Sequence, residues 1–184
     1  MEGKIVFQGK SKGGILFKIR YPKLSDVEKV WHYMNKLSEE KTFIRYQGEK
    51  VSFEEEKEYI QSKLKEINNN KSVVLFLIVN EKVMGICGID LLDKTENHVA
   101  KLGLSIDQEL RGQGLGEKLI ISTMEESKNN LNKLQIIKLE VKKPNNIAIK
   151  LYKKLGFKKY GHLPKGTTHQ GEYVDEIMMF KRVT

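Results

Sequence analysis

Apolar residues recur along the chain with two spacings, one typical of helices and one typical of strands. Between Leu24 and Leu37 they return every three or four positions, which predicts an amphipathic helix. Ser52 and Glu55 form a capping box before a second helix at about Phe53–Ile67. Two more helices are expected at about Gly114–Lys128 and Asn145–Leu155. Short apolar or alternating runs predict strands at Ile15–Arg20, Val73–Val79, Val83–Leu91, His98–Ile106, Leu134–Val141, Phe157–Gly161 and Glu172–Arg182.

The order of these elements predicts the fold class. Read along the chain it is β, α, α, β, β, β, α, β, α, β, β. An antiparallel meander that passes into βαβαβ requires a mixed sheet, so we expect one α/β (α+β) domain over residues 15–184. Residues 1–14 form either an extra hairpin strand, with Lys4–Gln8 as its β-type run, or a loose extension.

Composition places the chain among globular proteins. It is 39% hydrophobic and 31% charged, and no apolar run approaches the ~20 residues that span a bilayer. The first fourteen residues contain no apolar signal-peptide core, and the single cysteine, Cys87, cannot form an internal disulfide. We therefore expect a cytoplasmic protein. The four histidines and Cys87 show no metal-ligand spacing, so no metal is expected.

The positive charge is concentrated in one segment. The net charge is +9, and Ser127–Gly171 contains eleven lysines, no arginine and one acidic residue, Glu140, for a net charge of +10. Such a segment is compatible with ordinary solvated faces or with an anionic partner, either a polyphosphate cofactor or a nucleic acid. The lack of arginine and of interleaved aromatic residues argues against nucleic acid.

A glycine-rich turn, Arg111-Gly-Gln-Gly-Leu-Gly116, joins the His98–Ile106 strand to the next helix. Glycines allow the backbone to approach a ligand closely, and the free N–H groups at a helix N-terminus favour an anion. The turn matches neither the dinucleotide fingerprint nor the P-loop. Taken alone, it is also compatible with a tight turn that only needs glycine.

The surrounding residues add a family resemblance. The run from Leu104 to Leu119 resembles the acetyl-CoA signature (R/Q)-x-x-G-x-(G/A) of the GNAT superfamily, with Arg111, Gly114 and Gly116 at the matching positions. One departure is Gln108, where the family often has proline. The resemblance implies that N–H groups of this loop hold the pyrophosphate, and that the preceding strand bonds the pantetheine arm. It also implies a GNAT fold, with about six to seven strands and about four helices.

A second, independent motif follows. Leu139-Glu140-Val141 and the run from Asn145 to Phe157 are similar to L-E-V-x-x-x-N-x-x-A-I-x-L-Y-x-x-x-G-F, which is best developed in the ribosomal-protein N-terminal acetyltransferase subgroup. The two motifs together cover about residues 102–157. In the resembling subgroup the residue matching Glu140 is the general base and the residue matching Tyr152 is the general acid. Asn145 is expected to cap its helix, and the family adds a contact with the pantetheine region.

These residue types suit acetyl transfer to an amine. The reaction needs a neutral amine, a group that takes its proton and a proton for the leaving thiolate. Glu140 at a strand end and Tyr152 on the next helix can face one cleft, although Tyr152 is also compatible with a core position and Glu140 with simple charge balance. The expected catalytic residues are therefore Tyr152 and Glu140. The expected cofactor-binding residues are Leu104, Ile106, Arg111, Gly112, Gln113, Gly114, Leu115, Gly116, Glu117, Asn145 and Tyr152.

The partners implied are acetyl-CoA as co-substrate and an amine acceptor. The acceptor is either a small amine (a polyamine, an amino acid or an amino-bearing toxin) or a protein N-terminus, and its selection is expected from Thr42–Ser52 and His162–Glu172, the latter taken as mobile around Gly166–Gly171. The alternative is a non-catalytic module that senses coenzyme A or docks on RNA or the ribosome. A different acyl donor and a homodimer both stay open, and no membrane association is expected.

Overall fold

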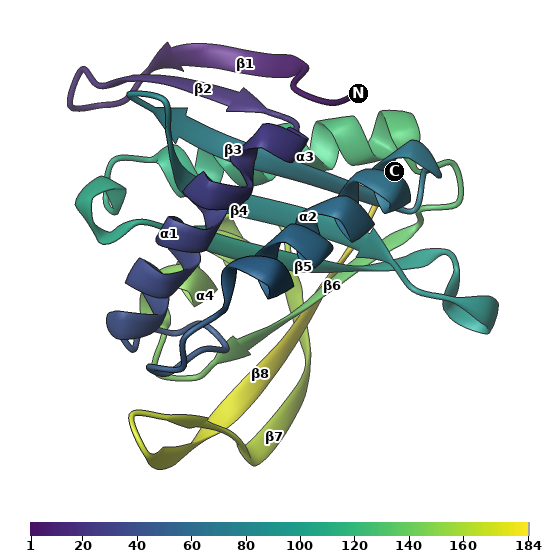
Figure 1. Cartoon of the computed structure of the whole chain (residues 1–184). Coiled ribbons are helices and arrows are strands. Elements are labelled where there is room, and N and C mark those ends of the chain that lie inside the picture. Colours follow the sequence, from purple (N-terminus) through teal and green to yellow (C-terminus); the bar gives the residue numbers. More distant parts are fainter. Residues whose placement is uncertain (184) are drawn as a thin grey trace.

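The computed structural model describes residues 1–183, which fold into one mixed sheet with helices on both faces (Figure 1). The strands are β1 Ile5–Lys10, β2 Leu16–Arg20, β3 Ser72–Val79, β4 Lys82–Leu91, β5 Val99–Ile106, β6 Ile136–Lys142, β7 Lys158–His169 and β8 Glu172–Arg182. The α-helices are α1 Val27–Glu39, α2 Phe53–Asn68, α3 Leu115–Asn130 and α4 Asn146–Lys154. Three 3₁₀ turns, η1 Leu24–Asp26, η2 Lys94–Glu96 and η3 Gln108–Leu110, complete the set.

The strand order is β1-β2-β3-β4-β5-β6-β8-β7. Neighbouring strands are antiparallel except β5 and β6, which are parallel. Helices α1 and α2 lie on one face of the sheet, and α3 and α4 lie on the other (Figure 1). Strand β3 is buried at every position, from Ser72 to Val79, because it lies in the middle of this sandwich. That burial on both faces explains its continuous apolar run.

The predicted mixed α/β fold is confirmed, with a larger sheet than expected. Eight strands form within residues 1–183, because β1 pairs with β2 as a hairpin from Lys10↔Leu16 to Ile5↔Arg20. The prediction of a short strand ending at Gly161 is wrong, since β7 continues to His169 and pairs with β8 across a turn at Gln170 and Gly171. The segment expected to be a mobile loop is therefore mostly strand.

The sequence signal failed in β7 for a local reason. Pro164 and Gly166 interrupt the apolar alternation, and the β7–β8 register shifts between Leu163 and Thr167. Pairing resumes at Thr167, so the outer part of the strand is held by β8 rather than by its own hydrophobic pattern.

A buried ion pair fixes the start of α1 against the sheet. The Arg20 guanidinium donates two hydrogen bonds to the Asp26 carboxylate, at 2.7 and 2.8 Å, and a third to the Tyr21 carbonyl. The side chains of Arg20 and Asp26 are only 8% and 2% exposed. Although burial acts to raise the pKa of Asp26, the bonds from Arg20 and from the Lys23 N–H outweigh it and leave that pKa lowered.

We predict that Asp26→Asn lowers the free energy of unfolding by about 3–5 kcal/mol, because it leaves the buried Arg20 charge without a counterion. Chemical denaturation of Asp26→Asn and of Glu28→Gln, whose side chain is 75% exposed, measures the difference. Glu28→Gln should change stability by less than about 0.5 kcal/mol. Equal effects of the two substitutions would contradict this account of the α1 start.

Candidate active site

The sheet opens between β5 and β6. Their parallel pairing extends only from Val99↔Ile136 to Lys101↔Lys138. Strand β5 nevertheless continues to Ile106, paired with β4, and β6 continues to Lys142, paired with β8. The two strands therefore diverge, leaving an opening between residues 102–106 of β5 and residues 139–142 of β6, which we call the wedge. On the side that faces the wedge, residues 102–106 of β5 have no strand partner.

The glycine-rich turn lies at the end of β5 and presents free donors. Gly112 and Gly114 have φ of 77° and 79°, which only glycine adopts without strain, and a Cβ at Gly112 would meet open space. Helix α3 has no side-chain N-cap. Among the residues described, the backbone N–H groups of residues 112–117 make no hydrogen bond. Such a run of donors at a helix N-terminus is suited to an anion.

The predicted cofactor residues on β5 and α3 come together around this turn. A Cβ built on Gly116 would lie 3.5 Å from the Ile106 side chain, 3.7 Å from Leu104 and 4.0 Å from Leu151 of α4. Gly116 therefore lies where α3, α4 and the wedge edge of β5 meet, and these distances are ordinary van der Waals contacts. Leu115, the first residue of α3, is buried in the core.

Three polar side chains of the predicted set hold the turn in place. Arg111 donates from Nε to the Ile106 carbonyl at 2.9 Å and forms an ion pair with Glu40 just after α1. Glu117 forms an ion pair with Lys154 of α4 at 2.7 Å. The Gln113 side chain accepts a hydrogen bond from Ser11 at 2.8 Å. In this arrangement all three side chains contact protein.

Asn145 and Tyr152 place α4 beside the wedge. The Asn145 side chain accepts a hydrogen bond from the Ala148 N–H at 3.1 Å, so the predicted helix cap is present. Tyr152 is only 7% exposed and packs edge-on against Phe157 at 5.8 Å. Its hydroxyl has no hydrogen-bond partner within residues 1–183. Burial, with a smaller effect of the nearby Cys87 thiol, raises the pKa of Tyr152 well above its ordinary value, so the phenol stays protonated.

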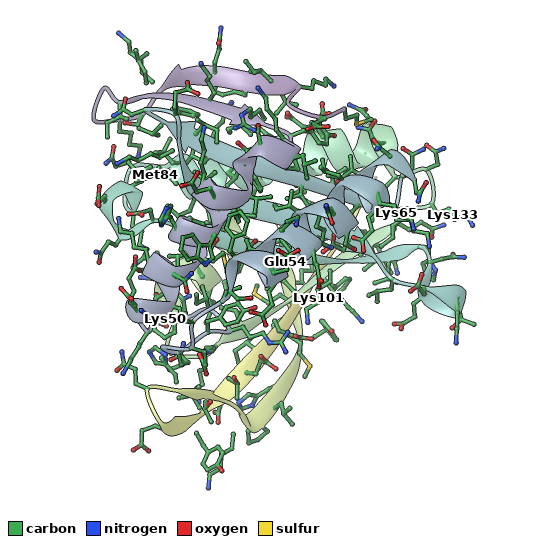
Figure 2. The ribbon with its side chains drawn as sticks, viewed as in Figure 1. Lys50, Glu54, Lys65, Met84, Lys101 and Lys133 are labelled. Atoms are coloured by element: carbon green, nitrogen blue, oxygen red, sulfur yellow. The ribbon has the colours of Figure 1, made fainter. Side chains whose placement is uncertain are left out.

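Glu140 lies on the opposite face of the sheet from Tyr152. Its neighbours Leu139 and Val141 are buried, whereas the Glu140 side chain points to the α1/α2 face and forms an ion pair with Lys101 at 2.6 Å. Figure 2 shows Lys101 in the part of that face below α2. Neither a hydrogen bond nor an ion pair joins Glu140 to Tyr152 among the described residues. The two predicted catalytic residues thus flank the wedge from its two sides.

The structure adds a second carboxylate that motif matching did not single out as catalytic. Glu176 on β8 is opposite Lys142 of β6 in the register and shares the face of Glu140. Burial raises the pKa of Glu176, and the nearby Glu140 charge raises it further, against opposing effects of Lys101 and Lys142. A carboxylate shifted in this direction is better suited to accept a proton near neutral pH.

Tyr33 is another residue of this region that the sequence did not indicate. Its hydroxyl donates to the Ser105 hydroxyl at 2.9 Å, joining α1 to the wedge end of β5. Burial raises the pKa of Tyr33 above its ordinary value. The apolar periodicity of α1 gives no sign of this contact, because Tyr33 fits the buried stripe equally well as a core residue.

The loop over residues 40–52, here called the bridge loop, spans the wide end of the wedge. It begins at Glu40, which contacts Arg111 after β5, and it reaches Lys142 at the end of β6. The Lys142 ammonium donates to the Ile44 carbonyl at 3.2 Å and to the Thr168 carbonyl of β7 at 2.8 Å. Phe43 also stacks on His169 with ring centroids 4.3 Å apart. The bridge loop and the β7–β8 hairpin, both predicted to select the acceptor, therefore meet here.

The described residues also form a hollow away from the wedge. A hollow of about 400 Å³ lies at the opposite end of the sheet from the glycine turn, lined by the α2 C-terminus, the β4–β5 turn and residues 132–133. Within residues 1–183, no group of three or more His, Cys, Asp or Glu side chains is arranged to hold a metal ion. None of the helices in that range is both long and apolar enough to traverse a bilayer.

Comparison with known proteins identifies the family. The sequence profile of the acetyltransferase (GNAT) family matches residues 31–157. The chain is 33% identical over 106 residues to the L-amino acid N-acetyltransferase AaaT of Escherichia coli K12. That match covers 57% of this chain and 65% of AaaT, so the chain spans less than two thirds of the length of this relative.

Solved structures agree at the level of the fold. A GNAT-family acetyltransferase from Streptococcus pneumoniae has a TM-score of 0.83 at 23% identity, covering 91% of this chain and 99% of that one. RimL, a ribosomal L7/L12 alpha-N-protein acetyltransferase solved with coenzyme A, has a TM-score of 0.80 at 13% identity over 98% of each chain. The chain belongs to the GNAT family of acetyltransferases. The predicted family is thereby confirmed, whereas the activity of the chain and the roles of individual site residues stay predictions.

Proposed function

We propose that this enzyme transfers the acetyl group of acetyl-CoA to the α-amine of a free amino acid. The observation that carries the proposal is that two surfaces meet at the wedge. One consists of the free edge of β5 and the N-terminus of α3, which has no side-chain cap. The other is the α1/α2 face, which carries both positive and negative side chains. When bound, acetyl-CoA supplies an activated thioester for attack by an amine.

The residues around the wedge fit such a co-substrate. The N–H groups of residues 112–117, which make no protein hydrogen bond, suit a pyrophosphate, and the unpaired edge of β5 suits an extended amide chain. Leu104 and Ile106 lie at that edge, so the assignment of the glycine turn and of β5 to the cofactor follows both the family and this geometry.

We assign Tyr152 the role of hydrogen-bond donor to the leaving sulfur. Because its pKa is raised, full proton transfer to a thiolate with an ordinary pKa of about 8.5 is uphill. A protonated phenol without a protein partner can instead stabilise developing negative charge by a hydrogen bond. This refines the role that the family resemblance suggested for Tyr152.

We assign proton acceptance to the carboxylates on the other side of the wedge. Glu176 has the raised pKa, because of its burial and the nearby charge of Glu140. In this proposal Glu176 takes the amine proton, directly or through a water, while burial and the negative charge of Glu140 keep the pKa of Glu176 high. Lys101 fixes the position of Glu140 through their 2.6 Å ion pair.

The acceptor assignment rests on charge and enclosure. Lys142 uses two of its three N–H donors on carbonyls of the bridge loop and β7, which leaves one for a ligand carboxylate. With Glu140 and Glu176 beside it, the face complements a zwitterion. The contacts that close the bridge loop onto the β7–β8 hairpin restrict access for a folded protein. The likeness to an L-amino acid N-acetyltransferase points the same way.

For Tyr152→Phe we predict that kcat falls by about tenfold or more, while the Kd for coenzyme A changes by less than about twofold. The hydroxyl makes no protein hydrogen bond, so the free energy of unfolding should stay within about 0.5 kcal/mol of wild type. Steady-state thiol release, calorimetric binding and denaturation measure the three quantities. An unchanged kcat, or a large loss of stability with the loss of rate, would rule out the assigned role.

The pH dependence of kcat at saturating acceptor tests the carboxylate pair. The pKa of Glu176 is raised, so the base form is lost, and kcat falls, at a higher pH than the ordinary glutamate value of about 4.3. Glu176→Gln should abolish this acid limb with a loss of about 10²-fold. Glu140→Gln removes a like charge and should move the limb to lower pH. An acid limb that survives Glu176→Gln unchanged would assign the base elsewhere.

An acceptor panel with acetyl-CoA tests the function itself. It contains single L-amino acids, polyamines, N-terminally free peptides and a blank without acceptor. We expect turnover on amino acids, and Lys142→Met should raise their KM by about tenfold without changing the KM for acetyl-CoA. Lys143→Met, which removes a lysine paired with Asp175, is the matched control. Turnover on peptides alone would show that the acceptor is a protein N-terminus rather than a free amino acid. Binding of coenzyme A without turnover on any acceptor would favour the non-catalytic module.

A further inference from the structure

The N-terminal hairpin lies directly against the glycine turn. Figure 1 shows the β1–β2 turn at the same end of the molecule as the loop that leads into α3. One hydrogen bond joins the hairpin to this turn, one cation–π contact joins it to the first turn of α3, and Lys12 lies close to Gly114. The Ser11 hydroxyl donates to Gln113 at 2.8 Å, Phe7 of β1 receives the Lys118 ammonium over its ring at 3.8 Å, and the Lys12 Cε lies 3.6 Å from the position a Cβ on Gly114 would take.

Ser11 organises this contact on both sides. Its hydroxyl oxygen accepts from the N–H groups of Gly13 and Ile15, each at 3.2 Å, which fixes the hairpin turn. The same hydroxyl donates to Gln113, whose side-chain nitrogen in turn donates to the Glu109 carbonyl at 3.3 Å. Gln113 is therefore held between the hairpin and the 3₁₀ turn before the glycine residues.

Lys12 is the cation that this arrangement brings to the site. It is exposed, and no carboxylate pairs with it among residues 1–183. Its side chain passes over Gly114, the N-cap of α3, where the N–H groups of residues 112–117 have no acceptor. The Lys12 ammonium, which has no counterion there, adds its positive potential to that of N–H donors that make no protein hydrogen bond.

We propose that the β1–β2 turn is part of the co-substrate site, with Lys12 binding the pyrophosphate of coenzyme A and Ser11 positioning the glycine turn through Gln113. The inference rests on the proposed function, because that function supplies the ligand. It gives the first fourteen residues a role in binding, where their sequence indicated only a strand or a loose extension. Lys12 acts as a point charge, so arginine at this position keeps most of the effect.

Calorimetric binding of coenzyme A and of dephospho-coenzyme A, which lacks the 3′-phosphate, tests the proposal. Lys12→Gln should raise the Kd for both ligands by about five- to tenfold, and its affinity should depend less steeply on salt. Lys12→Arg should stay within about twofold of wild type. The control is Lys18→Gln, which removes the same charge from β2 of this hairpin, where Lys18 pairs with Glu81, and it should have little effect.

Other results of these binding measurements would contradict the proposal. A loss of affinity confined to coenzyme A, with dephospho-coenzyme A unaffected, would place Lys12 on the 3′-phosphate and refute the pyrophosphate assignment. Equal effects of Lys12→Gln and Lys18→Gln on the Kd would show that Lys12 contributes only to the overall positive charge of the hairpin. Wild-type binding with no change in Lys12→Gln refutes this inference alone, whereas absence of binding by the wild-type protein refutes the proposed function as well.

Ser11→Ala separates positioning from charge. It keeps Lys12 but removes the bond to Gln113, so we expect a Kd for coenzyme A about threefold higher and faster amide hydrogen exchange at residues 112–114 in the free protein. Exchange in α4, which the hairpin does not contact, should not change. Unaltered exchange at the glycine turn would refute the positioning role.

Discussion

The short ladder between β5 and β6 is the constraint on which the site depends. Pairing stops at Lys101 and Lys138, yet both strands continue because β4 supports one and β8 supports the other. The sheet can therefore open without unfolding either strand. The exposed backbone groups of β5 are a cost that a ligand with amide groups can offset. The glycine turn, α4 and the bridge loop are all arranged around this opening. In our proposal the co-substrate and the amine acceptor therefore reach the wedge from different sides.

The positive charge that we assign to the co-substrate site does not come from the lysine-rich segment that the composition singled out. The lysine-rich segment from Ser127 to Gly171 is largely solvated or neutralised locally: Lys138 pairs with Glu96, Lys143 with Asp175 and Lys154 with Glu117. The cation that we assign to the phosphates, Lys12, comes instead from the N-terminal hairpin. The net charge of a segment thus says little about its partner until the counterions are located.

The sequence predicted the fold and the local motifs because these depend on short-range patterns. The capping box at Ser52, the Asn145 cap and the glycine turn are set by neighbouring residues, and all are present in the structure. The features that could not be predicted need residues distant in the chain to meet. Glu176 joins Glu140 only through the β6–β8 register, Ser11 reaches Gln113 across about a hundred residues, and the outer part of β7 depends on β8 for its pairing.

The central claim is that the wedge and the glycine turn together form the co-substrate site. Amide hydrogen exchange of the free and the coenzyme A-bound protein tests this claim most directly. The account predicts increased protection of those N–H groups of residues 102–106 that point away from β4, and of residues 112–117, because these backbone groups gain partners on binding. Residues 69–71 and 91–97, around the hollow at the other end of the sheet, should not change. Binding that protects this hollow and leaves the edge of β5 unchanged would contradict the account.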